Sequence, residues 1–118
     1  MNNASSKINW YKIAQHQHQL IFNTNNLLEV AVEGKKICVA KYNEKLTAFA
    51  ATCPHAGAAF VNGYIDALGY IVCPLHFYKF NVLLGKNCTN EGYFLKKYAI
   101  ESRQDGVFIG FQENNTNF

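Results

Sequence analysis

The sequence lacks several features that would assign it to a common class of protein. No apolar run approaches the roughly 20 residues that a membrane span needs, and residues 1–9 lack the apolar core of a signal peptide. The net charge is only +3, and no run of lysine and arginine is dense enough for a nucleic-acid or membrane-surface patch. We therefore expect a cytoplasmic protein that binds neither nucleic acid nor membrane.

The composition is that of a chain that folds on its own. With 118 residues, of which 49% are hydrophobic and 14% aromatic, it is long enough to bury a core in a single domain without disulfides. The sequence contains four cysteines. In a cytoplasmic chain they indicate metal ligation or free thiols rather than a disulfide framework.

Most of the chain has the two-residue periodicity of β-strands, and no segment has a clear helical periodicity. Gly34, Asn43-Glu44 and Asp105-Gly106 separate the alternating segments in the way that turns do. Short strands with regular turns predict an all-β fold, a small antiparallel sandwich or barrel. The predicted strands are residues 10–13, 28–33, 37–42, 46–51, 98–100 and 107–111.

Residues 53–92 interrupt this pattern of strands. They contain both prolines and five of the eight glycines, which indicates a loop-rich subdomain inserted between strands. Functional side chains commonly lie on loops that a sheet holds in place. We predict a single domain over residues 10–112 with this subdomain at about 53–92, an N-terminal tail over 1–9 and an Asn-rich C-terminal tail over 113–118.

Two Cys/His couples lie in this subdomain. Cys53-Pro54-His55 is followed, after the seventeen residues 56–72, by Cys73-Pro74-Leu75-His76. Chance rarely supplies two Cys-Pro pairs that each have a histidine one or two residues later. Each couple offers a soft thiolate and an imidazole, the ligand types of zinc and of iron–sulfur centres.

Three interpretations of Cys53, His55, Cys73 and His76 are open at this point. They are two buried cysteines with two unrelated histidines, a structural zinc site, or a [2Fe–2S] cluster with the thiolates on one iron and the imidazoles on the other. The one-residue separation of Cys53 and His55 fits zinc less well, because zinc fingers usually separate paired ligands by two or more residues.

The spacing of the couples and the residues around them resemble the Rieske [2Fe–2S] signature. The likeness extends from the opening Trp10–Ile13 to the closing strand at Val107, so it covers most of the chain. Its two boxes are highly specific. The boxes and the turn between them are Ala51–Gly57, Asn62–Asp66, Cys73–Phe80 and Leu84–Lys86.

This resemblance implies one [2Fe–2S] cluster per chain, with Cys53 and Cys73 on one iron and His55 and His76 on the other. It also implies a Rieske-like fold of small antiparallel sheets, with the cluster loops at one tip and both histidine rings near the surface. An exposed imidazole on iron would be a short exit route for an electron, and its other nitrogen would exchange a proton as the iron changes oxidation state.

Some residues near the couples depart from the respiratory Rieske proteins. In those proteins a disulfide braces the two loops, and its positions match Ala58 and Leu75 here. They also have a serine and a tyrosine that donate hydrogen bonds to cluster sulfur, at positions that match Tyr78 and Phe80. Because hydrogen bonds to sulfur raise the potential, the resemblance predicts a potential toward the low end of the Rieske range.

The chain also departs from Rieske oxygenase catalytic subunits, which often have Gly-Trp after the second histidine, where this chain has Phe77-Tyr78. Those subunits need a second domain with a mononuclear iron site. Outside the couples only His16 and His18 remain, in a polar stretch that we interpret as a solvated loop. We therefore expect an electron-transfer protein rather than an enzyme that acts alone.

The two other cysteines lie outside the couples. Cys38 belongs to an apolar predicted strand, and we expect it to be a small buried residue. Cys88 follows Gly85-Lys86-Asn87 in a predicted loop. A Cys38–Cys88 disulfide stays an open alternative that a cytoplasmic setting disfavours.

The leading hypothesis is a soluble Rieske-type ferredoxin that carries one electron from a flavin-containing or NAD(P)H-dependent reductase to an oxygenase or another oxidoreductase. The first alternative is a small Rieske subunit of an oxidoreductase such as assimilatory nitrite reductase, and the second is the structural zinc module. Phe60, Phe77 and Tyr78 would either form part of a docking face for redox partners or shield the cluster from water.

Overall fold

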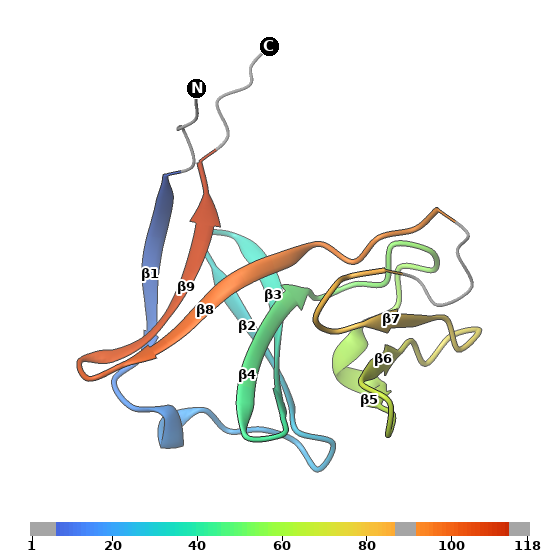
Figure 1. Ribbon diagram of the computed structural model, residues 1–118, viewed down its shortest axis with the longest axis horizontal. Helices are drawn as coiled ribbons and strands as arrows, with labels where there is room; N and C mark the ends of the chain where they lie inside the picture. The colour runs from blue at the N-terminus through green and yellow to red at the C-terminus, as the bar shows by residue number, and fades with distance from the viewer. Residues whose placement is uncertain (1–6, 87–91, 114–118) are drawn as a thin grey trace.

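The computed structural model describes residues 7–86 and 92–113, which form two antiparallel sheets (Figure 1). The larger sheet has six strands in the order β1-β9-β8-β4-β3-β2, and the smaller has three in the order β5-β6-β7. The helical part of these ranges consists of the short 3-10 turns η2 (Gln17–Gln19) and η3 (Phe60–Asn62), neither long or apolar enough to cross a membrane. The strands are β1 (Ile8–Ala14), β2 (Leu27–Val32), β3 (Lys35–Tyr42), β4 (Lys45–Ala50), β5 (Tyr64–Ile65), β6 (Tyr70–Val72), β7 (Lys79–Asn81), β8 (Lys97–Arg103) and β9 (Gly106–Gln112).

Tight turns between alternating segments produce the larger sheet. The turn between β2 and β3 has Glu33 and Gly34 at φ values of 50° and 80°, and the turn between β3 and β4 has Asn43 and Glu44 at 52° and 63°. Two successive residues with positive φ are typical of the hairpin turns whose twist matches that of the flanking strands. The prediction of an all-β, antiparallel fold is confirmed, and Figure 1 shows the larger sheet curling into a half-barrel.

The smaller sheet belongs to a segment inserted between β4 and β8. These two strands pair with each other, with Ala48 opposite Tyr98 and Phe49 opposite Lys97. The inserted segment therefore leaves and re-enters the larger sheet at neighbouring points. Figure 1 shows it as a lobe beside the larger sheet, and we refer to residues 51–86 and 92–96 as the inserted lobe.

Two groups of buried side chains form the core. One lies against the larger sheet and includes Ile37 and Ile109, which are fully buried. The other joins the sheet to the inserted lobe through three fully buried rings, those of Phe49 on β4, Phe60 on η3 and Phe80 on β7. The ring centroids of Phe49 and Phe60 are 5.7 Å apart and those of Phe60 and Phe80 are 5.9 Å apart, both edge to face. Such contacts add to the free energy of burial, so they hold the lobe firmly on the sheet.

A largely buried lysine also connects the inserted lobe to the larger sheet. Lys97 of β8 donates hydrogen bonds from Nζ to Thr47 Oγ1 on β4 and to the carbonyl oxygen of Val82, which follows β7. Its ammonium group lies 5.8 Å from the centre of the Phe49 ring. Burial lowers the pKa of Lys97 to about 8, because the charged amine loses hydration.

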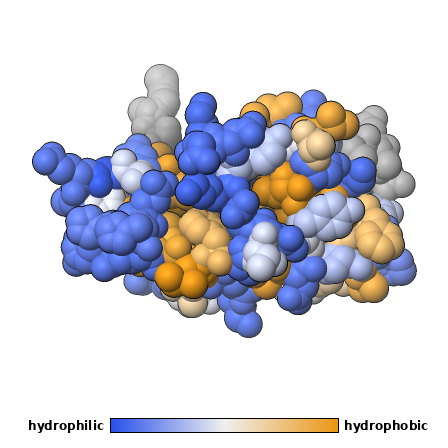
Figure 2. Space-filling view, turned by 90° about the horizontal axis from the view of Figure 1, so that it is seen from below, coloured by the Kyte–Doolittle hydropathy of each residue, from blue (hydrophilic) through white to orange (hydrophobic). Residues whose placement is uncertain are grey.

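Most of the strongly exposed apolar side chains belong to the inserted lobe. Leu68, Leu83, Leu84 and Phe77 lie there and are between 66% and 79% exposed, and Ile21 at 75% lies outside it. On the face seen from below, Figure 2 shows apolar patches separated by hydrophilic residues. The lobe therefore combines a buried aromatic attachment with an apolar exterior.

Replacing Gly63 by Ala should strongly destabilise the inserted lobe. A Cβ atom at Gly63 would lie 2.1 Å from the carbonyl oxygen of Val72, a backbone atom that cannot turn away. We expect Gly63→Ala to lower the free energy of unfolding by about 3 kcal/mol or more, measured by urea denaturation. As a control, Gly34→Ala meets nothing within 4 Å and should cost only the about 1–2 kcal/mol of its left-handed φ. Equal losses in the two variants would contradict the crowding at Gly63.

The pKa of Lys97 predicts a pH dependence of stability. The unfolded chain keeps this lysine protonated up to about pH 10.5, whereas the folded chain releases the proton near pH 8. Between these values the unfolded state binds more protons, so this lysine makes the free energy of unfolding rise with pH. We expect the wild type to gain stability relative to Lys97→Met between about pH 8 and about pH 10, measured by urea denaturation at several pH values.

The matched control for this measurement is Lys96→Met, which removes the exposed lysine next in the chain. Its stability should run parallel to that of the wild type over the same pH range. Parallel profiles for the wild type and Lys97→Met would contradict the effect of burial on Lys97.

Candidate metal centre

The first Cys/His couple lies in a tight loop after β4. Ala59 ends this loop and forms an isolated β-bridge with Thr52. Within it the Cys53 N–H donates to the Ala58 carbonyl at 2.9 Å, and the Gly57 N–H donates to the Cys53 carbonyl at 2.8 Å. Gly57 has a φ of +75°, a conformation that favours glycine. These hydrogen bonds close the loop around His55.

The second couple lies in the loop between β6 and β7. The Cys73 N–H donates to the Tyr78 carbonyl at 2.8 Å, which closes the loop, and the Leu75 N–H donates to Cys73 Sγ at 3.4 Å. His76 and Phe77 have φ values of 68° and 59°. Successive non-glycine residues in this region are uncommon and are found at functional sites more often than elsewhere. In this turn, Cys73 is buried whereas His76, three residues later, is exposed.

The structure brings the two candidate cysteines together in the interior. Cys53 is 2% exposed, Cys73 is fully buried, and both are free thiols. Burial raises the pKa of the Cys73 thiol; the Leu75 N–H opposes this, and the Cys53 thiol, in hydrogen-bonding contact with Cys73, adds to it. Two buried thiols in contact would release their protons to solvent when a metal cation binds them, which is how thiolate ligands form.

The structure also brings the two candidate histidines together. The ring centroids of His55 and His76 lie 6.0 Å apart with the ring planes at 82°. His55 Nδ1 is buried and has no hydrogen-bond partner among the described residues. An unpartnered buried polar atom costs about 1–3 kcal/mol, a cost that a metal ion bound to Nδ1 would remove.

The donors are therefore arranged as a sulfur pair and an imidazole pair. Within residues 7–86 and 92–113, no group of three or more His, Cys, Asp or Glu side chains gathers around one point. The buried thiols and the unpartnered Nδ1 fit a centre that takes sulfur at one metal ion and nitrogen at the next.

The two histidines differ in their surroundings. His76 is exposed, as expected, whereas His55 is only half-exposed. Tyr78 stacks on His55 with ring centroids 3.6 Å apart and the planes 9° from parallel. Tyr93, in the segment before β8, meets the His55 ring at 5.2 Å and 80°. Sequence analysis missed Tyr93, and its only signal was an aromatic pair, Tyr93-Phe94, just before a predicted strand.

The three residues discussed as docking or shielding groups have different environments. Phe60 is fully buried in the core that joins the sheets, so the suggestion that it forms part of a docking face is wrong. Phe77 is 66% exposed and Tyr78 is half-buried against His55. Phe77 is thus the exposed member of the three, and Tyr78 covers a candidate ligand.

The other described cysteine and histidines, which are Cys38, His16 and His18, belong to segments outside the two couples. Cys38 is a free, fully buried thiol of β3, and burial raises its pKa to about 12, which makes it a poor nucleophile or ligand. Cys88 lies outside the described residues. His16 and His18 are exposed, and their rings stack at 5.1 Å around the short turn η2.

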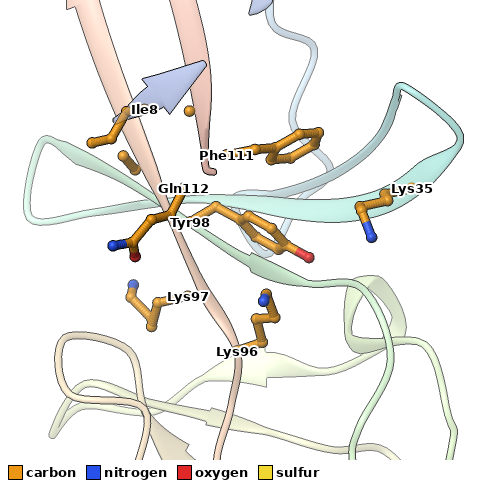
Figure 3. Close-up of a pocket in the computed structure, with 9 residues that line it drawn as sticks. Ile8, Lys35, Lys96, Lys97, Tyr98, Phe111 and Gln112 are labelled. Carbon is orange, nitrogen blue, oxygen red and sulfur yellow. The ribbon is translucent and has the colours of Figure 1, made fainter. Parts of the chain in front are cut away.

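A hollow of about 360 Å³ lies on the larger sheet, away from the couples (Figure 3). Its lining comes from β1, β3, β8, β9 and the residue before β8, and none of the four candidate ligands contributes to it. Lys97 Nζ, which lines it in part, is already bonded to Thr47 and Val82. The lining residues are Ile8, Lys35, Lys96, Lys97, Tyr98, Ala99, Gly110, Phe111 and Gln112.

Solved structures with this fold include redox proteins. The ferredoxin of carbazole 1,9a-dioxygenase from Nocardioides aromaticivorans IC177 superposes with a TM-score of 0.70 over 85% of this chain and 95% of its own, at 20% identity. A proposed NADH-dependent nitrite reductase small subunit from Mycobacterium tuberculosis gives a TM-score of 0.74 over 89% and 96%, at 14% identity. Identities this low establish the fold only.

Sequence comparison is more specific. The ferredoxin component of the naphthalene 1,2-dioxygenase system of Pseudomonas putida is 31% identical over 85 residues, which are 71% of this chain and 81% of that protein. The family model of the Rieske [2Fe-2S] domain matches residues 9–98, from β1 through both couples to the start of β8. The chain belongs to the Rieske [2Fe-2S] domain family.

Proposed function

We propose that this protein is a Rieske-type ferredoxin, which carries one electron from a reductase to an oxygenase or another oxidoreductase. The observations that carry the proposal are a buried pair of thiols in contact with each other and a pair of neighbouring imidazoles, of which His76 is exposed. Ligands of which some are buried and one is exposed suit a carrier, because the cluster would be protected yet close enough to the surface to exchange electrons with other proteins.

We propose that Cys53 and Cys73 hold one iron of a [2Fe–2S] cluster, that His55 and His76 hold the other, and that each chain binds one cluster. Membership of the Rieske family implies this type of cluster. The contact between the two thiols and the unpartnered Nδ1 of His55 support this choice of ligands. When bound, the cluster supplies a reversible one-electron couple.

The chain's own residues orient and shield the ligands. The Leu75 N–H donates to Cys73 Sγ and so stabilises negative charge on sulfur. Phe80 has only its buried ring where a tyrosine hydroxyl would be needed to donate to a cluster sulfur. Leu75 and Phe77, which flank His76 in the sequence, are 46% and 66% exposed and offer an apolar contact for transient docking.

Sequence identity favours an electron carrier over the alternative, a small subunit of an oxidoreductase. The relative at 31% identity is a ferredoxin component, whereas the nitrite reductase small subunit shares the fold at 14% identity. Membership of the Rieske family disfavours a structural zinc module, because the domain of that family binds a [2Fe–2S] cluster. The location in the cytoplasm stays a prediction.

Substitution of the proposed ligands should abolish the cluster. We expect the purified protein to be red-brown and to give an EPR signal on reduction, and we expect Cys53→Ala and His55→Ala to lose both. Cys38→Ala and His18→Ala are matched controls, because Cys38 belongs to β3 and His18 to η2, outside both couples, and they should keep colour and signal. A colourless wild type that contains zinc would refute the proposal.

The midpoint potential should lie toward the low end of the Rieske range, near about −150 mV. The physical reason is that Phe80 provides no hydroxyl to stabilise the extra negative charge on sulfur in the reduced state. Cyclic voltammetry near neutral pH measures this potential. A strongly positive midpoint near neutral pH would contradict the prediction.

A further inference from the structure

We propose that the hollow on the larger sheet is a binding site for an organic anion with a flat apolar body, such as an aromatic carboxylate (Figure 3). Lys35 and Lys96 would hold the negative group of the ligand, and the rings of Tyr98 and Phe111 would contact its apolar body. None of the four candidate cluster ligands lines the hollow, so this site does not depend on the proposed electron transfer.

The hollow has the size and the walls of a small-molecule site. Its volume of about 360 Å³ falls within the roughly 300–1,000 Å³ of ligand pockets, which are mostly apolar with a few polar groups that orient the ligand. Ile8 of β1, Lys35 of β3, Tyr98 of β8 and Phe111 of β9 all line it. Because these strands belong to one sheet, the walls are in place before a ligand arrives.

Two aromatic rings form the apolar part of the lining. The ring centroids of Tyr98 and Phe111 lie 5.3 Å apart with the planes at 58°, and Tyr11 also contacts Phe111 at 5.3 Å. All three rings pack against the buried group that contains Ile37 and Ile109, which fixes their positions. A flat ligand on these rings would remove apolar surface from water, and ring contacts add to the gain.

The charged residues that line the hollow are all positive. They are Lys35, Lys96 and Lys97, and no aspartate or glutamate contributes to the lining. The ammonium group of Lys97 is already bonded to Thr47 and Val82. Lys35 and Lys96, by contrast, are exposed and form no ion pair with a carboxylate in the part of the chain that the structure describes. Two such cations beside an aromatic wall favour a ligand that is negative at one end.

Tyr98 connects the charged and the aromatic parts of the hollow. Lys96 Nζ lies 5.7 Å from the centre of the Tyr98 ring, and Figure 3 shows the Tyr98 hydroxyl directed toward the side where Lys35 lies. Burial raises the pKa of Tyr98, so its hydroxyl stays protonated at neutral pH and can donate a hydrogen bond. A carboxylate at this end of the hollow would accept that hydrogen bond in the field of two cations.

Isothermal titration calorimetry with probes of one shape and different charge tests the site. Biphenyl-4-carboxylate, biphenyl-4-methanol and biphenyl-4-methylammonium share a ring system and differ in charge at one end. We expect the purified full-length protein to bind the carboxylate at least about ten-fold more tightly than the alcohol, and the ammonium compound more weakly still. Added salt should weaken the binding of the carboxylate and leave that of the alcohol unchanged.

Variants of the lining residues locate the binding. Lys35→Met, Lys96→Met and Tyr98→Phe should each weaken the binding of the carboxylate several-fold and leave that of the alcohol unchanged. The matched control is Lys36→Met, which removes the same charge from the next residue of β3. Lys36 is exposed but does not line the hollow, because successive side chains of a strand point to opposite faces. Its loss should leave the affinity for the carboxylate unchanged.

Each outcome decides the proposal. A dissociation constant of the carboxylate weaker than about 1 mM overturns it. Equal affinities for the carboxylate and the alcohol, or equal effects of Lys35→Met and Lys36→Met, overturn it as well. If one lining variant does not fold, the other variants and the series of probes decide. A wild type that contains no iron but binds the carboxylate as expected would refute the proposed function and leave the anion site standing.

Discussion

The edge-to-face contact of Phe49, Phe60 and Phe80 is the interaction on which the rest of the molecule depends. Phe60 follows the residue that ends the loop of the first Cys/His couple, and Phe80 lies two residues after Tyr78, which closes the loop of the second couple. Both loops are therefore attached to the same buried stack, which rests on Phe49 of the larger sheet. Because protein interiors are close-packed, this stack limits how far the two loops can separate.

The pairing of β4 with β8 makes this attachment possible. It returns the inserted lobe to the sheet beside its starting point, and there Lys97 links β8, β4 and the segment after β7. The larger sheet is thus the base on which the lobe, with all four candidate ligands, is held. Where a respiratory Rieske protein has a disulfide between its loops, this chain has Ala58 and Leu75. Its loops are held by their closing hydrogen bonds, the phenylalanine stack and the rings around His55.

The four candidate ligands differ in how far they are exposed to solvent. The thiols of Cys53 and Cys73 are buried, His55 is enclosed by aromatic rings, and His76 is exposed. Burial keeps water away from the sulfur atoms, where it would compete for hydrogen bonds. The exposure of His76 puts one candidate ligand at the surface.

Much of the molecule could be predicted from local features of the sequence. The strands follow from two-residue periodicity, the hairpins from their turn residues, and the candidate ligands from two short motifs, because each of these signals lies within a few neighbouring residues. Contacts between distant segments could not be predicted. The position of Tyr93 against His55, the burial of Phe60 rather than its use as a docking surface, and the loss of hydration at Lys97 depend on which strands pair and how the lobe returns. The types of donor atom and their spacing along the chain follow from the sequence alone. Which donors are buried and which is exposed follows from the fold, because burial results from the packing of segments far apart in the chain.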